Sequence, residues 1–185
     1  MIRKLGLIVL LSAACQYALA DQAFDDNLKK AKSGDPVAQA TAGTSYLYGR
    51  GVNADFAQAK IWFMKAAEKG NADGQFNLGM LYNFGQGAQQ DFTQSAKWLE
   101  KAAANSKAPI HFFAEYHLAK LYEHGNGVKR DYKKAADLYT KAADGGIAEA
   151  KDAAEALAEK MDQEAKAEAE AEAEAAKTQK ATTKK

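Results

Sequence analysis

Three copies of one segment follow one another along the chain, and this repetition limits the possible folds more than any other feature. Tyr46, Tyr82 and Tyr122 are 36 and then 40 residues apart, and each is followed by two glycines separated by a single residue. The same spacing relates three aspartates that follow the glycines: Asp55, Asp91 and Asp131. Lysine and two alanines then close each copy, at residues 65–67, 101–103 and 141–143. So many positions in one register predict a stack of similar units, none of which is stable alone.

Each copy is expected to form two helices joined by a glycine loop. In the second copy Leu78, Leu81 and Tyr82 recur at helical spacing and form one apolar stripe. Gly85 and Gly87 are expected to end this helix, because glycine adopts a positive φ without a steric penalty.

The second helix of each copy is expected to begin at the recurring aspartate. A carboxylate at this position accepts hydrogen bonds from the first free N–H groups and faces the positive end of the helix dipole. After Asp91 a second stripe of apolar and small residues follows at helical spacing: Phe92, Ser95, Trp98, Leu99, Ala102 and Ala103. One hairpin cannot bury two such stripes alone, and we therefore expect the hairpins to stack.

These motifs resemble the Sel-1-like repeat, a variant of the tetratricopeptide repeat. Residues 78–82 match its Leu-Gly-x-x-Tyr motif, and residues 98–103 match its closing aromatic-x-x-Lys-Ala-Ala motif. The match covers roughly residues 37–150, and three single residues depart from it: Ala42, Ala88 and Ala119. The resemblance implies an all-α solenoid. It also implies an adaptor of the kind that bacteria use in envelope assembly, signalling or contact with host cells.

The repeated motifs and the changes in composition together predict the following segments: a signal peptide at 1–20, an N-terminal capping helix at 21–36, repeats at 37–72, 73–108 and 109–146, a C-terminal capping helix at 147–162, and a tail at 163–185. Pro109 is expected to begin the first helix of the third repeat. The tail is rich in Ala, Glu and Lys and has no apolar stripe. Like charges such as Glu168 and Glu172 disfavour a helix by roughly 0.2–0.5 kcal/mol per pair, so we expect a frayed helix or disorder.

The first twenty residues have the three parts of a secretory signal peptide. Arg3 and Lys4 form the positive start, residues 5–14 are apolar, and residues 18–20 suit cleavage after Ala20. An apolar run of this length spans only about 15 Å as a helix, roughly half of a bilayer core, which favours a cleaved leader over a membrane anchor. We therefore expect a periplasmic or secreted protein.

The single cysteine leaves an alternative open. Residues 11–15 partly resemble the lipobox of bacterial lipoproteins, although Ser12 stands where a branched apolar residue is usual. Lipidation of Cys15 would produce an outer-membrane lipoprotein. Cleavage after Ala20 would instead leave a chain without cysteine, whose core must hold together without disulfides.

The charge balance argues against nucleic acid as a partner. The chain has 25 basic and 24 acidic residues, and removal of the leader leaves 23 basic residues against the same 24 acids. Neither phosphate backbones nor anionic membranes attract such a chain strongly. We expect another protein or a peptide as the partner, and no transmembrane span in the mature chain. The identity of the partner and the oligomeric state stay open.

No motif in the sequence predicts catalysis. The Gly-x-Gly loops do not extend to a phosphate-binding pattern, and no serine stands in a nucleophile-elbow motif. His117 and His124 share a helix face, but two turns separate them by roughly 10.5 Å, too far for one metal ion. We expect no enzyme activity, no metal site and no cofactor.

The resemblance implies that the first helix of each repeat lines a concave groove. The positions that would face this groove are Ala40, Thr44, Tyr48, Phe76, Met80, Phe84, Phe113, Tyr116 and Lys120. An aromatic and methionine stripe on such a face suits capture of a peptide, but the same residues would also serve to pack neighbouring helices together. The leading hypothesis is a non-enzymatic scaffold or adaptor, and the alternative is a structural component of the envelope.

Overall fold

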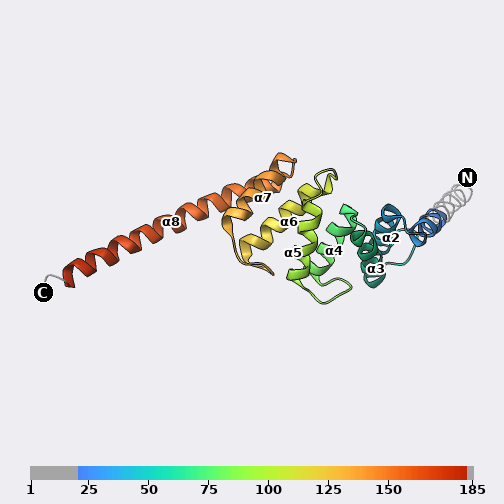
Figure 1. Ribbon diagram of the computed structural model, residues 1–185, viewed down its shortest axis with the longest axis horizontal. Coiled ribbons are helices and arrows are strands. Elements are labelled where there is room, and N and C mark those ends of the chain that lie inside the picture. Colours follow the sequence, from blue (N-terminus) through green and yellow to red (C-terminus); the bar gives the residue numbers. More distant parts are fainter. Residues whose placement is uncertain (1–20, 183–185) are drawn as a thin grey trace, which may run out of the picture.

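The computed structural model describes residues 21–182, and all regular secondary structure in this range is helical (Figure 1). A helix over residues 21–32 comes first. Three hairpins follow: α2 (Pro36–Tyr48) with α3 (Phe56–Glu68), α4 (Ala72–Phe84) with α5 (Phe92–Ala103), and α6 (Ile110–His124) with α7 (Tyr132–Asp144). Helix α8 (Ala148–Thr182) ends the described chain. The predicted all-α solenoid is confirmed.

Two predictions on export concern the beginning of the chain. The signal peptide predicted over residues 1–20 lies outside the described residues, and so does Cys15. Between residues 21 and 182 no helix combines the length and the apolar character that crossing a bilayer requires.

The recurring aspartates cap the second helix of each hairpin, as predicted. The Asp55 carboxylate accepts hydrogen bonds from the backbone N–H groups of Ala57 and Gln58, at 2.9 and 3.0 Å. Asp91 and Asp131 cap α5 and α7 with one such hydrogen bond each, from the backbone N–H groups of Gln94 and Lys134. The first helix of the third hairpin differs slightly from its prediction, because α6 begins one residue after Pro109 and has no side-chain cap.

In the second and third loops, the second glycine lies against the hairpin before it. Gly87 and Gly127 have φ angles of 67° and 70°. A Cβ atom on Gly87 would lie 2.3 Å from the carbonyl oxygen of Phe56, at the start of α3. A Cβ atom on Gly127 would lie 2.2 Å from the carbonyl carbon of Phe92, at the start of α5. Only glycine permits this approach between consecutive hairpins.

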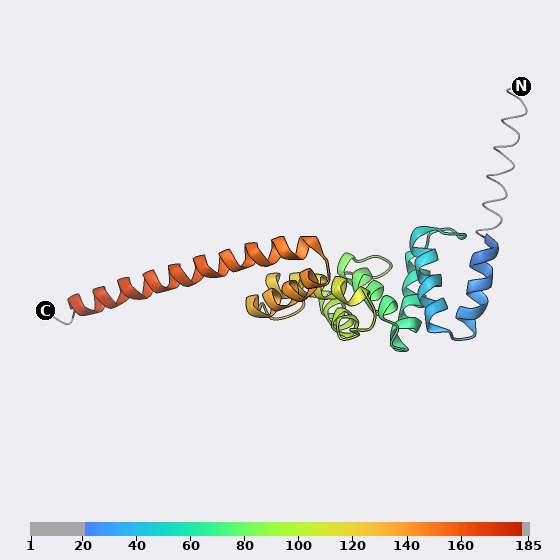
Figure 2. The ribbon, with the colours of Figure 1, turned by 90° about the horizontal axis from the view of Figure 1, so that it is seen from above.

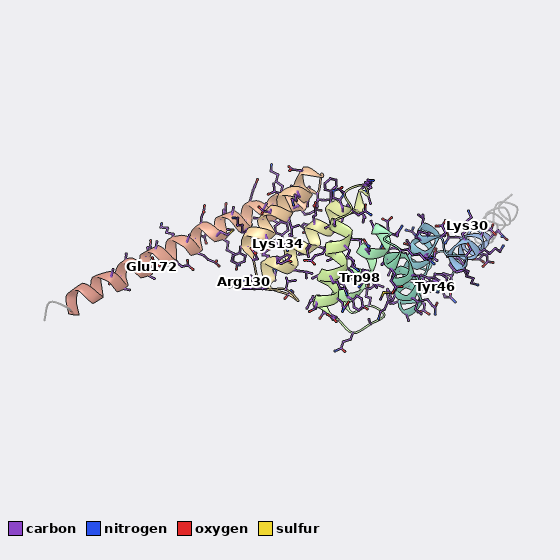
Figure 3. The ribbon with its side chains drawn as sticks, in the orientation of Figure 1. Lys30, Tyr46, Trp98, Arg130, Lys134 and Glu172 are labelled. Atoms are coloured by element: carbon purple, nitrogen blue, oxygen red, sulfur yellow. The ribbon has the colours of Figure 1, made fainter. Side chains whose placement is uncertain are left out.

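The first helices of the hairpins form the inner layer of the solenoid. Helix α4 packs against both α2 and α6, whereas α3, α5 and α7 contact one another much less in the described part of the chain. A stack of hairpins curves toward the layer whose helices lie closer together. Figures 2 and 3 show this stack, with Tyr46 and Trp98 within it. The concave side is therefore built from α2, α4 and α6.

Helix α8 belongs to the solenoid only in its first part. Ile147, Ala150 and Leu157 are buried in the core formed with α6 and α7, and Met161 packs against its edge. Every residue from 162 to 176 is exposed. The helix nevertheless continues to Thr182, where the sequence predicted fraying or disorder, and projects away from the hairpins as one rod (Figure 2).

Candidate functional site

Two adjoining pockets lie on the side formed by α2, α4 and α6, and we call them together the groove. The Tyr48 pocket lies between α2, α3 and α4, has a volume of about 450 Å³, and is lined by Leu47, Tyr48, Phe56, Phe76, Asn77, Met80, Leu81, Phe84 and Gln86. The His117 pocket lies between α4 and α6, has a volume of about 350 Å³, and is lined by Asn83, Phe84, Gln90, Phe92, His117, Lys120, Leu121, His124 and Asn126. Phe84 lines both, so the two pockets meet at this side chain.

The groove contains aromatic side chains that the fold leaves exposed. Tyr48 is 63% exposed, Phe84 is 60% exposed and Phe56 is 42% exposed. Tyr48 and Phe84 are the last residues of α2 and α4, each directly before a glycine in the left-handed conformation. Because the chain turns away at that glycine, the rest of the hairpin leaves both rings largely uncovered, although the Arg50 guanidinium lies 5.1 Å from the centre of the Tyr48 ring. Large apolar side chains gathered in this way mark an interaction surface more often than single exposed ones do.

His117 is a neutral side chain on the wall between the pockets and the core. Its ring centroid lies 5.8 Å from that of Phe76 and 5.3 Å from that of Tyr116. Burial, with a smaller contribution from nearby Lys120, lowers the pKa of His117 to about 4. The imidazole is therefore uncharged at neutral pH and serves as an aromatic surface.

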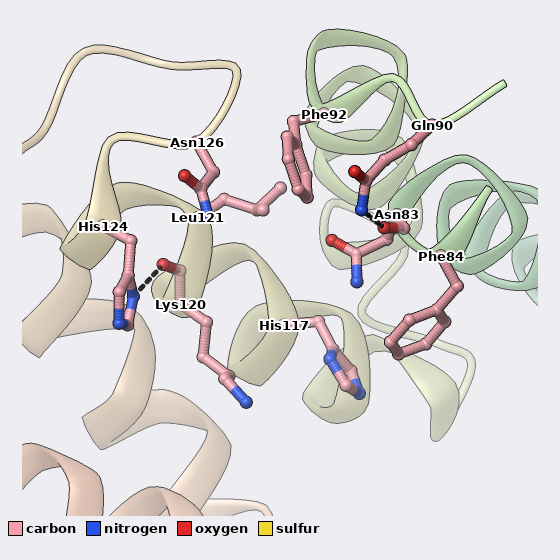
Figure 4. A pocket seen from close by; sticks show the side chains of 9 residues that line it. All are labelled: Asn83, Phe84, Gln90, Phe92, His117, Lys120, Leu121, His124 and Asn126. Atoms are coloured by element: carbon pink, nitrogen blue, oxygen red, sulfur yellow. Dashed lines mark hydrogen bonds between the residues drawn. The ribbon is translucent and has the colours of Figure 1, made fainter.

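The charge in the groove comes from Lys120. No aspartate or glutamate lines either pocket. The Lys120 ammonium lies 5.5 Å from the centre of the Tyr116 ring and has no ion pair with any residue that the structure describes. Figure 4 shows this side chain beside His117, with His124 one turn further along α6. The Nδ1–H group of His124 donates a hydrogen bond at 2.9 Å to the backbone carbonyl oxygen of Lys120.

Amide side chains supply the remaining polar groups. The Gln90 amide donates a hydrogen bond to the Asn83 carbonyl oxygen at 2.8 Å, which fixes the loop before α5 against α4 (Figure 4). The side-chain amides of Asn83, Gln86 and Asn126 have no hydrogen-bond partner among the described residues. They leave donors and acceptors available along the groove.

The structure brings five of the residues predicted from sequence together in this groove. Tyr48, Phe76, Met80 and Phe84 line the Tyr48 pocket, and Lys120 lines the His117 pocket. Phe76 and Met80 also pack against the core, so the two roles considered for them coexist.

The other predicted residues lie elsewhere. The Thr44 hydroxyl donates a hydrogen bond to the Ala40 carbonyl oxygen, and neither residue lines the pockets. Tyr116 packs against Tyr139 with ring centroids 5.7 Å apart, at the edge of the core. Phe113 is 46% exposed but lines neither pocket.

Sequence reasoning missed several lining residues, and one of them had a clear signal. The 40-residue spacing from Tyr82 to Tyr122 makes His124 the counterpart of Phe84, and His124 lines the His117 pocket although only Phe113, Tyr116 and Lys120 were expected from the third repeat. No sequence pattern points to Phe56 as a groove residue. It is the first residue of α3, a second helix, and lines the Tyr48 pocket only because the loop before α3 returns the chain to that side.

The described residues contain no group of three or more histidine, cysteine, aspartate or glutamate side chains placed to hold a metal ion. The groove offers apolar walls, amides and one cation, and this set is suited to binding rather than to proton or group transfer.

Comparison with known proteins agrees with the repeat. The model of the Sel1 repeat matches residues 36–71, 72–107 and 113–147, more than half of the chain. No curated protein matches the chain.

Solved structures are similar over most of the described region. A Sel1 repeat protein from Oxalobacter formigenes is 34% identical with a TM-score of 0.65, and the match covers 77% of this chain and 54% of that protein. The chain thus spans about half the length of this relative. Cysteine-rich protein B of Helicobacter pylori shares the fold at 18% identity and a TM-score of 0.56, over 71% of this chain and 94% of its own. With three matched repeats and a similar solved structure, this chain belongs to the Sel1 repeat family.

Proposed function

We propose that the protein is a non-enzymatic scaffold that binds a protein partner through the groove. Sel1-repeat proteins are generally protein-interaction scaffolds. The proposal also takes the leader over residues 1–20 as an export signal and places the scaffold in the bacterial envelope or outside the cell.

The observation that carries the proposal is the exposure of Phe84 at the junction of two pockets. A phenylalanine with 60% of its surface in contact with water contributes little to folding. The fold buries other large side chains completely, such as Phe63, Leu78 and Leu99. Together with Tyr48 and Phe56, Phe84 forms an apolar surface that a partner would cover.

Crosslinked affinity capture from the native cell envelope tests the proposal. The bait is the full chain, and the variants are Tyr48→Ala with Phe84→Ala and, as a matched control, Phe113→Ala. Phe113 is also an exposed aromatic residue on a first helix, but it lines neither pocket. We expect one partner to be captured by the wild type and by Phe113→Ala, and to be lost with the double variant. A partner that all three proteins retain would remove the groove from the proposal.

Helix α8 favours a second candidate, a spacer in the envelope. Its exposed part begins near residue 162, and a helix from there to Thr182 is about 30 Å long at 1.5 Å per residue. Deletion of residues 163–185 would release the protein from the envelope fraction if the rod tethers the solenoid there. If the shortened protein stays in the envelope fraction, the spacer function is refuted and the scaffold proposal is unaffected.

A further inference from the structure

We propose that the groove binds an extended peptide segment that carries a large apolar side chain and, about three residues away, an aspartate or glutamate side chain. This inference rests on the proposed function and specifies the chemistry of the partner. The apolar side chain would occupy the Tyr48 pocket, and the carboxylate would occupy the His117 pocket.

The Tyr48 pocket selects an apolar occupant. Its walls are aromatic or aliphatic apart from Asn77 and Gln86, and the Asn77 amide already donates a hydrogen bond to the Asp73 carbonyl oxygen at 2.8 Å. A volume of about 450 Å³ holds a phenylalanine, leucine or tryptophan side chain together with part of its backbone. Burial of such a side chain is favourable because it also covers the exposed rings of Tyr48 and Phe84.

The His117 pocket selects a negative group. Lys120 is its only side chain with a permanent charge, and it has no carboxylate partner among residues 21–182. His117 is neutral, so it neither adds charge nor repels a cation itself. Asn83 and Asn126 add amide donors on the opposite walls. A basic residue placed here would meet the Lys120 ammonium, whereas a carboxylate would accept hydrogen bonds from all three side chains.

The unpaired amides favour an extended backbone over a helix. A helix satisfies its own backbone groups, and only an extended segment presents free N–H and C=O groups to Asn83, Gln86 and Asn126. The two pockets lie on either side of α4, and neighbouring helices are about 8–10 Å apart. At roughly 3.3 Å per residue an extended chain covers this distance in about three residues.

Display of random dodecapeptides against the full chain provides the test. We expect the enriched peptides to share a large apolar residue and an acidic residue about three positions apart. One enriched peptide is then synthesised with a fluorescent label, blocked at both ends, in its acidic form and with the acid replaced by its amide. Its dissociation constant is measured by fluorescence anisotropy against the wild type, Lys120→Gln and Phe84→Ala.

Loss of the peptide's acid should weaken binding to the wild type about three- to tenfold, the range expected for one partly exposed charged contact. The same loss should weaken binding to Lys120→Gln much less, because only the neutral amides of Asn83 and Asn126 then face the acid. Lys133→Gln is the matched control, because Lys133 is an exposed lysine of α7 outside both pockets. Binding to this control should resemble binding to the wild type.

The possible failures are distinguishable. Peptides that need Phe84 but show no acidic preference, or whose acid acts independently of Lys120, would overturn this inference and leave the scaffold proposal intact. Binding that requires a free carboxyl terminus would also overturn it. If no enriched peptide depends on Phe84, this inference also falls, and the capture experiment with the Tyr48→Ala and Phe84→Ala double variant decides the scaffold proposal separately.

Discussion

Replacing Glu115 with glutamine is expected to stabilise the protein at neutral pH. Three buried side chains occupy the same position in the three repeats: Gln39, Gln75 and Glu115. The Gln39 amide donates a hydrogen bond to the Ala31 carbonyl oxygen at 3.1 Å, and the Gln75 amide donates one to the Ala67 carbonyl oxygen at 3.2 Å. Each bond joins a first helix to the helix before it. An ionised glutamate has no proton to donate in the third repeat.

The carboxylate of Glu115 is buried and incompletely hydrogen-bonded. Glu115 is 8% exposed, and one of its carboxylate oxygens has no hydrogen-bond partner. Burial raises the pKa of Glu115, and Coulomb interactions with His111 and Lys141 oppose this shift. A buried polar group without a partner costs about 1–3 kcal/mol. Since the positive charge of Lys141 offsets part of this cost, we expect a gain of about 1 kcal/mol for Glu115→Gln, or about 2–4 °C in Tm.

The pH dependence follows from the direction of the shift. A raised pKa in the folded state means that the native protein binds this proton more tightly than the unfolded chain does. The corresponding stability is fully present below the ordinary pKa of 4.5 and is lost as pH rises through the folded value. The advantage of Glu115→Gln over the wild type should therefore be largest near pH 7 and should shrink toward pH 4.

Thermal unfolding followed by circular dichroism between pH 4 and 8 measures this difference. Glu159→Gln serves as the control, because it removes the same charge from an exposed position of α8. A constant difference between Glu115→Gln and the wild type across this range would refute the assignment to ionisation of Glu115. A Glu115→Gln protein that is less stable than the wild type at pH 7 would refute the argument from burial.

Three further predictions concern the repeats and the rod. Gly87→Ala should destabilise the protein by about 1–3 kcal/mol more than Gly70→Ala in thermal unfolding: both glycines have positive φ, but only the Cβ at 87 would collide with the Phe56 carbonyl group. Equal effects would mean that the loops do not hold neighbouring hairpins together. Asp91→Ala should cost about 1 kcal/mol in urea unfolding through the lost cap of α5, and an unchanged midpoint would show that water replaces the cap. Deletion of residues 163–185 should leave Tm within about 1 °C, because the described part of that segment buries nothing, and a larger fall would reveal a contact with the hairpins.

The sequence predicts the fold well because the fold follows from the repeat of 36 to 40 residues. Tyr46, Tyr82 and Tyr122 set the register, the glycines end the first helices, and Asp55 and Asp91 begin the second helices. Each of these signals acts within a few residues, so no knowledge of distant contacts is needed. The extent of α8 was harder to predict, because alanine and glutamate favour a helix while the like charges oppose it by similar small amounts.

The groove is less predictable because it depends on contacts between repeats. Phe56 and Gln90 belong to the loops and helix starts of one hairpin but line pockets formed with another helix. Phe113 carries an aromatic side chain on the expected helix, yet it lies outside the 40-residue register that places His124 in the groove. Alignment of the third repeat on Tyr122 pairs His124, and not Phe113, with Phe84. The burial of His117 could not be inferred from any local pattern.

The last residue of each first helix determines how polarity changes along the groove, with little effect on folding. The last residue of each first helix is Tyr48, then Phe84, then His124, and each precedes a left-handed glycine that turns the chain away. Because the core is completed by residues two or three positions earlier, such as Leu81 and Tyr122, the residue at this position packs little against the core. Stacking brings the three side chains onto one side of the solenoid, in chain order. The change from the aromatic rings of Tyr48 and Phe84 to the imidazole of His124 therefore gives the groove an apolar end and a polar end. Lys120 adds a positive charge at the polar end.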